Sequence, residues 1–220
     1  MNLPEIESFY KIHRHTYPEP FRLRIHRSLS WLGKAQERLA ADDRDMAFQS
    51  LWIAFNAAYA REIDGRTMST DRSDFQAFLN YVCMLDAEKR VSALIWKEFS
   101  GAIRSLLNNR YVFQSFWDFH NGKISEVAWL EEFEKSRKKV NMSLAMQDTS
   151  SVLLVLFDRL YTLRNQMIHG GATYGSSANR YQLKDACRIL EALQPVILMI
   201  MQENADKDWG RPYYPFVRED

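Results

Sequence analysis

The spacing of apolar residues constrains this chain more than any other feature of its sequence. Through most of the chain they recur every three or four residues, the period of an α-helix with one side facing a core. In residues 22–40, for example, Ile25, Leu29 and Leu32 share one side of the expected helix. Eight glycines and six prolines in 220 residues leave few breaks, and no segment alternates with the two-residue period of a strand. The sequence therefore predicts an all-α helical bundle.

The organisation along the chain follows from these patterns. We expect helices at 22–40, 43–62, 74–84, 87–107, 125–141, 150–169 and 180–204, the last one interrupted by Pro195, and a short helix in the aromatic-rich insert 108–123. Residues 64–73 and 170–180 are expected to be loops. The helices form a single domain of residues 21–204, between an N-terminal arm (1–20) and a C-terminal tail (205–220).

Composition limits the classes of function. With 29 basic and 28 acidic side chains the net charge is +1, so any site for a polyanion must be local. Cys83 and Cys187 lie within apolar helical patterns, with no CxxC pair and no signal peptide, which is typical of reduced thiols in a cytoplasmic protein. The longest apolar runs, 152–157 and 195–201, are far shorter than the roughly 20 residues of a membrane helix. We therefore expect no association with a membrane.

The sequence carries no recognisable metal or cofactor motif. The five histidines, at positions 13, 15, 26, 120 and 169, lack the spacing of metal ligands. No P-loop, GxGxxG or Ser/His/Asp order is present. The sequence therefore predicts no metal and no cofactor.

The stretch RNQMIHGG (164–171) is unusual because it places polar, functional side chains at the end of an apolar helix. Gly170 and Gly171 are typical helix terminators. Arg164 and His169 are separated by about 140° of rotation and roughly 7.5 Å of rise on an ideal helix, so they do not share a face, whereas Asn165 and His169 do. A histidine in a last turn lies where the helix dipole favours positive charge, and it is suited to proton transfer. An arginine adds a fork of donors that matches phosphate oxygens.

These residues together could bind a phosphodiester and move its protons without a metal. The simpler alternative is that basic residues near a helix C-terminus are common and that Gly-Gly is an ordinary stop. The chain would then be a helical interaction protein whose motif is only a helix end.

The R-N-x-x-x-H-G-G motif resembles the signature of the HEPN superfamily. The upstream segment AFQSLWIAFNAAYARE (47–62) is similar to the helix that packs against the motif helix in bacterial HEPN proteins, including ApeA-like and other ribonuclease-type members. The resemblance covers these two segments and the helical pattern, and it does not extend to residues 1–20 or to the insert 108–123.

The resemblance implies a helical dimer that acts as a metal-independent endoribonuclease. In catalytic members the motif helices of two protomers meet, and the 2′-OH of the RNA attacks the adjacent phosphate. His169 would then be the acid/base group, Arg164 would hold the phosphate, and Asn165 would orient the histidine or bind the ribose-phosphate. Such enzymes act in toxin–antitoxin systems or anti-phage defence, so an antitoxin or regulatory protein is an expected partner.

Four further residues are candidates for supporting roles. Asn56, beside Tyr59 in the aromatic stripe of 43–62, either bonds to a neighbouring helix or holds Arg164 or His169 in place. Tyr174 and Arg180 lie in or beside the loop after the motif and could touch RNA, although a solvated loop explains them too.

Two observations qualify these expectations: the first concerns neutralisation of the enzyme by AMP transfer, and the second concerns catalysis itself. Some HEPN toxins carry a tyrosine two residues after the histidine, which a partner nucleotidyltransferase modifies with AMP; here that position is Gly171. The near-neutral charge also favours an alternative, a non-catalytic HEPN module that binds RNA, a nucleotide or a protein partner.

Overall fold

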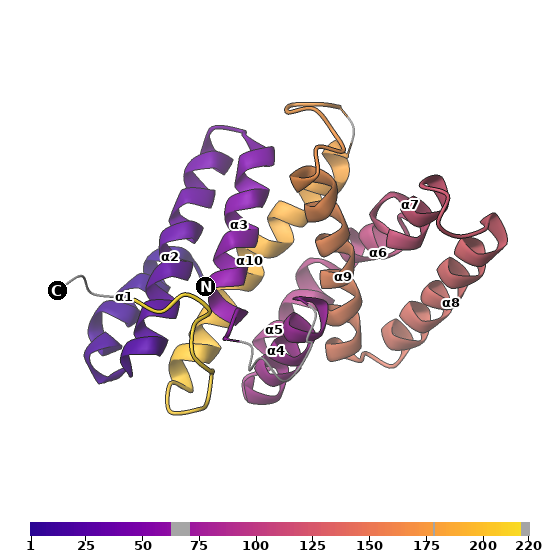
Figure 1. Ribbon diagram of the computed structural model, residues 1–220. Coiled ribbons are helices and arrows are strands. Elements are labelled where there is room, and N and C mark those ends of the chain that lie inside the picture. Colours follow the sequence, from indigo (N-terminus) through magenta and orange to yellow (C-terminus); the bar gives the residue numbers. More distant parts are fainter. Residues whose placement is uncertain (63–70, 178, 217–220) are drawn as a thin grey trace. The chain divides into compact units, whose positions relative to one another are not determined.

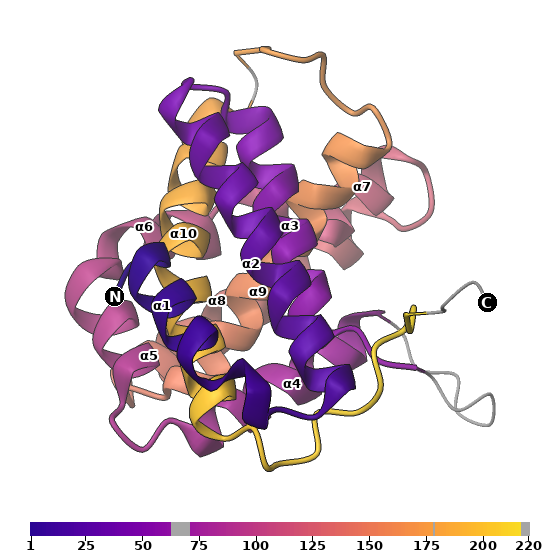
Figure 2. The same ribbon diagram turned by 90° about the vertical axis from the view of Figure 1, so that its left-hand side faces the viewer.

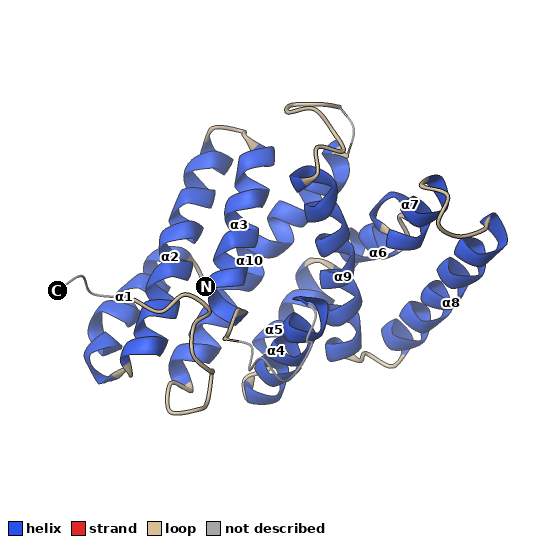
Figure 3. Ribbon diagram, in the orientation of Figure 1, coloured by secondary structure: helices blue, strands red, loops and turns tan. Residues whose placement is uncertain are grey.

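A computed structural model describes residues 1–62, 71–177 and 179–216 of the chain (Figure 1). Within these ranges every regular element is a helix, apart from an isolated bridge between Arg61 and Pro212 (Figure 3). The all-α prediction is therefore confirmed. Among the described residues, no helix has both the length and the apolar character that a membrane span needs.

The chain forms two compact units, Met1–Val91 with Ala186–Asp220, and Ser92–Asp185. The boundaries fall inside helices α5 (Arg90–Ala93) and α10 (Arg180–Glu203), where the sequence carries no sign of a linker. The two units are described separately.

The first unit is built around two helices that run side by side, α2 (Glu19–Ala40) and α3 (Arg44–Tyr59) (Figures 1 and 2). The carboxylate of Asp43 accepts from the amide of Met46 and so caps the start of α3. Helix α4 (Asp71–Leu85) contacts α3. Helix α10 is also held to α3, because the side-chain amide of Gln194 donates to the Leu51 carbonyl at 2.5 Å. The expected loop 64–73 falls largely on residues outside the described ranges.

Residues 1–20 hold a helix, α1 (Leu3–His13), and a 3₁₀ turn, Arg14–Thr16. Asn2 and Glu5 form a reciprocal capping box at the start of α1. Leu3, Ile6 and Tyr10 are buried, and α1 contacts α2. The residues expected to form an N-terminal arm are thus largely helical and belong to the first unit.

Helix α10 continues through Pro195, so the expected interruption is wrong. Proline removes one backbone donor and disfavours a helix interior. The residues that follow it, 196–201, are all buried, and the packing of this turn keeps the backbone helical.

Arg24 is a fully buried cation, with 1% of its surface exposed. Its Nη1 donates to the carbonyls of Ala58 (2.7 Å) and Ala60 (2.9 Å), and its Nη2 donates to that of Gly210 (3.2 Å). Burial, together with the charge of Arg61, lowers the pKa of Arg24 to about 10, which still leaves it protonated at neutral pH. One guanidinium therefore connects α2, the end of α3 and the C-terminal tail.

The second unit contains the π-helix Leu94–Glu98, α6 (Ser100–Leu107), a 3₁₀ turn (Arg110–Val112), α7 (Gln114–His120), α8 (Glu126–Ala145) and α9 (Thr149–Ile168). The single helix expected at 87–107 is therefore broken. It begins only at Arg90, because the Asp86 carboxylate accepts from the amides of Arg90 and Val91, and it changes hydrogen-bond period before Ser100.

Replacement of Arg24 by leucine should lower the free energy of unfolding by about 2–4 kcal/mol, because three carbonyls lose their donor. Arg22→Leu, on the same helix but exposed, should change it by no more than about 0.5 kcal/mol. Urea denaturation monitored by circular dichroism measures both values. Equal effects of the two substitutions would show that the buried guanidinium does not stabilise the fold.

Candidate functional site

The motif lies in the last turn and a half of α9, where the sequence places it. Hydrogen bonds from Ser151 hold the pKa of the Asp148 carboxylate below its usual value, and this carboxylate caps the start of the helix. The buried side of α9 includes Leu153, Leu156 and Leu160, and the helix contacts α6 and α8. This buried stripe fixes the direction in which the last turn presents its polar residues.

Two backbone hydrogen bonds end α9 in a Schellman motif. The Gly170 amide donates to the Met167 carbonyl at 3.2 Å, and the Gly171 amide donates to the Gln166 carbonyl at 2.6 Å. Gly170 has a φ of +70°, in the left-handed region. A Cβ at position 171 would lie 2.9 Å from the Gln166 oxygen, so a side chain here requires the backbone to shift. The tyrosine that some HEPN toxins carry at this position would therefore need a differently shaped helix end.

Asn165 is bonded to both other candidate catalytic residues. Its side-chain oxygen accepts from Nη1 of Arg164 at 3.0 Å, and its backbone carbonyl accepts from the amide of His169 at 3.0 Å. The amide side chain therefore restrains the arginine, whereas the bond to His169 is the last i→i−4 bond of the helix and holds its backbone only.

His169 caps the C-terminal end of α9 and is exposed. No described residue of the second unit makes a hydrogen bond to its ring. Arg164, five residues earlier, is half-buried. A ligand can therefore reach the imidazole directly, and the guanidinium on another side of the same helix end is restrained by Asn165.

Gln166 holds the motif in place, a role that the sequence pattern did not indicate. Its Nε2 donates to the Tyr111 carbonyl at 2.5 Å, and its Oε1 accepts from Nδ2 of Asn179 at 3.1 Å. It thus ties the motif to the insert on one side and to the following loop on the other. Its position inside the motif is the one sequence feature that could have indicated this role.

A buried arginine of α9, comparable with Arg24 of the first unit, holds the insert (108–123) in place. Arg159, 1% exposed, donates to the hydroxyl of Ser136 on α8 at 2.7 Å and lies 4.4 Å from the centre of the Phe113 ring. The insert thereby places Arg110 and Tyr111, both exposed and 5.0 Å apart from guanidinium to ring centre, beside the motif helix. These two residues are additional candidates for contacts with a ligand.

The other candidate residues fall in different places. Tyr174 is 72% exposed in the loop after the motif, and Arg180 begins α10 and is half-buried. Asn56 and Tyr59 lie on α3 in the first unit, so their support of Arg164 or His169 stays a prediction. Among the described residues no group of three or more His, Cys, Asp or Glu side chains is placed to hold a metal ion.

Comparisons of the chain with protein-family models, with curated proteins and with solved structures gave no match. The structure therefore shows an all-helical protein in which helix α9 ends in polar side chains. Its assignment to the HEPN superfamily is a proposal.

Replacement of Gly170 or Gly171 by alanine should destabilise the protein by about 1–2 kcal/mol each, because the first adds a Cβ at positive φ and the second forces it against a carbonyl. Gly101→Ala, in α6 with no atom near the added Cβ, should be neutral or stabilise by up to about 1 kcal/mol. Chemical denaturation of the three variants checks this. A stability loss in Gly101→Ala as large as in the other two would contradict the role of the Schellman motif.

Proposed function

We propose that the end of α9 is the active site of a metal-independent endoribonuclease of HEPN type. Three side chains at this helix end carry the proposal. The imidazole of His169 is exposed at the helix cap, and the guanidinium of Arg164 is held by the side-chain amide of Asn165. An imidazole is the side chain best suited to move protons near neutral pH, and a restrained guanidinium matches phosphate oxygens.

The chemistry that these groups would support is transesterification. One imidazole takes the proton of the ribose 2′-OH, whose oxygen forms a new bond to phosphorus. The bond from phosphorus to the 5′ oxygen breaks, and that oxygen takes a proton from an imidazolium. Arg164 would stabilise the negative charge that develops on the phosphate oxygens. The products are a 2′,3′-cyclic phosphate and a 5′-OH end.

Two chains would complete this site. The reaction needs a proton acceptor and a proton donor, and each chain supplies one His169 at this position. Ile168, beside it, is 54% exposed, so the last turn of α9 also offers an apolar contact. A two-fold arrangement that uses this turn twice would bring both imidazoles and both arginines to one cleft.

The insert would supply contacts that do not depend on the bond being cleaved. Tyr111 offers a ring on which a base can stack, and Arg110 offers charge for a neighbouring phosphate. Local charges of this kind would compensate for a net charge of only +1. An enzyme that cuts cellular RNA also needs restraint, so an antitoxin or other regulatory protein belongs to the proposal, within a toxin–antitoxin or defence system.

A second candidate is a HEPN module that binds RNA, a nucleotide or a protein without cleaving RNA. The balance of 29 basic and 28 acidic side chains favours it, because a ribonuclease usually presents a clearly basic surface. This module would keep the same helix end as a binding site.

The test is RNA cleavage by the purified chain in the presence of EDTA. The wild type should degrade cellular RNA, and His169→Ala should lose about 100-fold or more of the rate, since it lacks the acid/base group. His15→Ala, an exposed histidine of the first unit, is the matched control and should retain the wild-type rate. Equal RNA loss with wild type and His169→Ala, or none with either, would refute catalysis at this site.

A further inference from the structure

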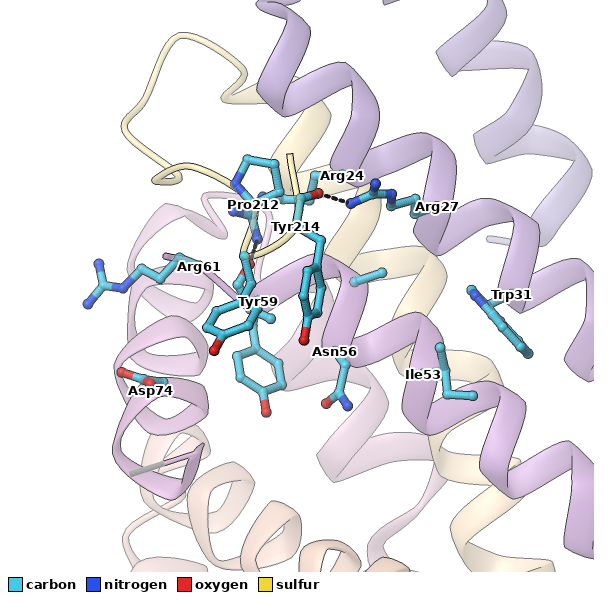
Figure 4. Close-up of a pocket in the computed structure, with 13 residues that line it drawn as sticks. Arg24, Arg27, Trp31, Ile53, Asn56, Tyr59, Arg61, Asp74, Pro212 and Tyr214 are labelled. Carbon is cyan, nitrogen blue, oxygen red and sulfur yellow. Dashed lines mark hydrogen bonds between the residues drawn. The ribbon is translucent and has the colours of Figure 1, made fainter. Parts of the chain in front are cut away.

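A cavity of about 600 Å³ lies within the first unit (Figure 4). Helices α2 and α3 form two of its sides, and the C-terminal tail forms another. The residues on which the argument depends are Arg27 and Trp31 of α2, Asn56 and Ala57 of α3, and Tyr214 of the tail. Its volume is within the range of cavities that hold small-molecule ligands.

The sequence forms this cavity in a simple way. Arg24, Arg27 and Trp31 follow one face of α2 at helical spacing, and Asn56 and Ala57 lie on the face of α3 that lines the same space. Alanine at 57 leaves the space open where a larger side chain would fill it. The tail is held across it because Nη1 of Arg27 donates to the Tyr214 carbonyl at 2.6 Å.

Asn56 presents an incomplete set of hydrogen bonds to this space. Its side-chain oxygen is buried, yet it has no hydrogen-bond donor among the described residues. A buried amide oxygen without a donor is costly, and in native proteins such a group is met by an ordered water or by a donor of a bound ligand. A ligand that supplies an N–H group at this point would remove the cost.

The lining carries more positive than negative charge. Three arginines, Arg24, Arg27 and Arg61, line the cavity, with Asp74 as the acidic residue among the lining side chains. The Nη groups of Arg24 already donate to carbonyls of the protein. Figure 4 shows the side chain of Arg61 directed away from Asn56 and Tyr214. Arg27, which uses Nη1 for the tail, has its second Nη available for an anionic group.

Two exposed aromatic rings belong to the same lining. Trp31 is 40% exposed and Tyr214 is 73% exposed, so neither ring is spent on the core. In Figure 4 the ring of Tyr214 projects from the tail into the cavity, toward the side on which Asn56 lies. Flat rings of this kind stack on planar heterocycles.

We infer that this cavity binds a small anionic ligand with a planar, N–H-bearing heterocycle, the chemistry of a nucleoside monophosphate. The heterocycle lies against the Tyr214 ring with its N–H on the Asn56 oxygen, in the manner in which an asparagine amide pairs with an adenine edge. The phosphate lies at Arg27. The site belongs to the first unit alone and does not depend on the proposed ribonuclease activity.

Isothermal titration calorimetry of the full chain with AMP, adenosine and ribose 5-phosphate tests the inference. AMP should bind once per chain, and adenosine and ribose 5-phosphate should each bind more weakly by about tenfold or more, because each makes part of the contacts. Asn56→Leu should weaken AMP and adenosine by about tenfold and leave ribose 5-phosphate unchanged. Ala57→Trp, whose ring enters the open space, should abolish binding of all three, and it decides the matter if Asn56→Leu does not fold.

Arg22→Leu, an exposed arginine of α2 outside this cavity, is the matched control and should bind AMP as the wild type does. Absence of heat with AMP, GMP and UMP alike would overturn the inference. AMP binding that persists in folded Ala57→Trp would place the nucleotide elsewhere and would overturn it too. Neither result bears on the proposed ribonuclease activity, which the comparison of wild type with His169→Ala tests separately.

Discussion

The burial of two guanidinium groups, one in each unit, is the constraint on which much of this structure depends. A charge removed from water is tolerated only where its donors meet acceptors. The two Nη groups of Arg24 donate to carbonyls at the end of α3 and in the tail, and those of Arg159 donate to Asp158 and Ser136 while its guanidinium lies over the Phe113 ring. Each arginine therefore fixes segments that are distant in the sequence, and each candidate site is built on those segments.

The two sites use this rigidity differently. In the second unit, Arg159 and Gln166 hold the insert beside a helix end whose backbone hydrogen bonds are completed by Gly170 and Gly171. The polar side chains of that end are thereby presented by a defined backbone, as proton transfer requires. In the first unit, the tail that Arg24 and Arg27 hold leaves a space beside Asn56.

Much of the fold could be predicted from the sequence, because the apolar period marks buried helix faces directly. The end of α9 was predictable as well, since Gly-Gly after an apolar helix has few other uses. The break at Asp86–Arg90 was not, because it depends on where one carboxylate finds its donors. Nor were the buried Arg24 and Arg159, since an arginine in a helical pattern looks like a solvated residue until its acceptors are known.

Mixed dimers test whether RNA cleavage needs an imidazole from each of two chains. When wild-type chains exchange with an excess of His169→Ala chains, most wild-type chains enter dimers that carry a single His169. If the cleft is shared, the rate of RNA cleavage in EDTA per wild-type chain should then fall well below that of the wild type alone. An unchanged rate per wild-type chain, although native mass spectrometry shows that the chains have exchanged, would show that one chain supplies the whole site.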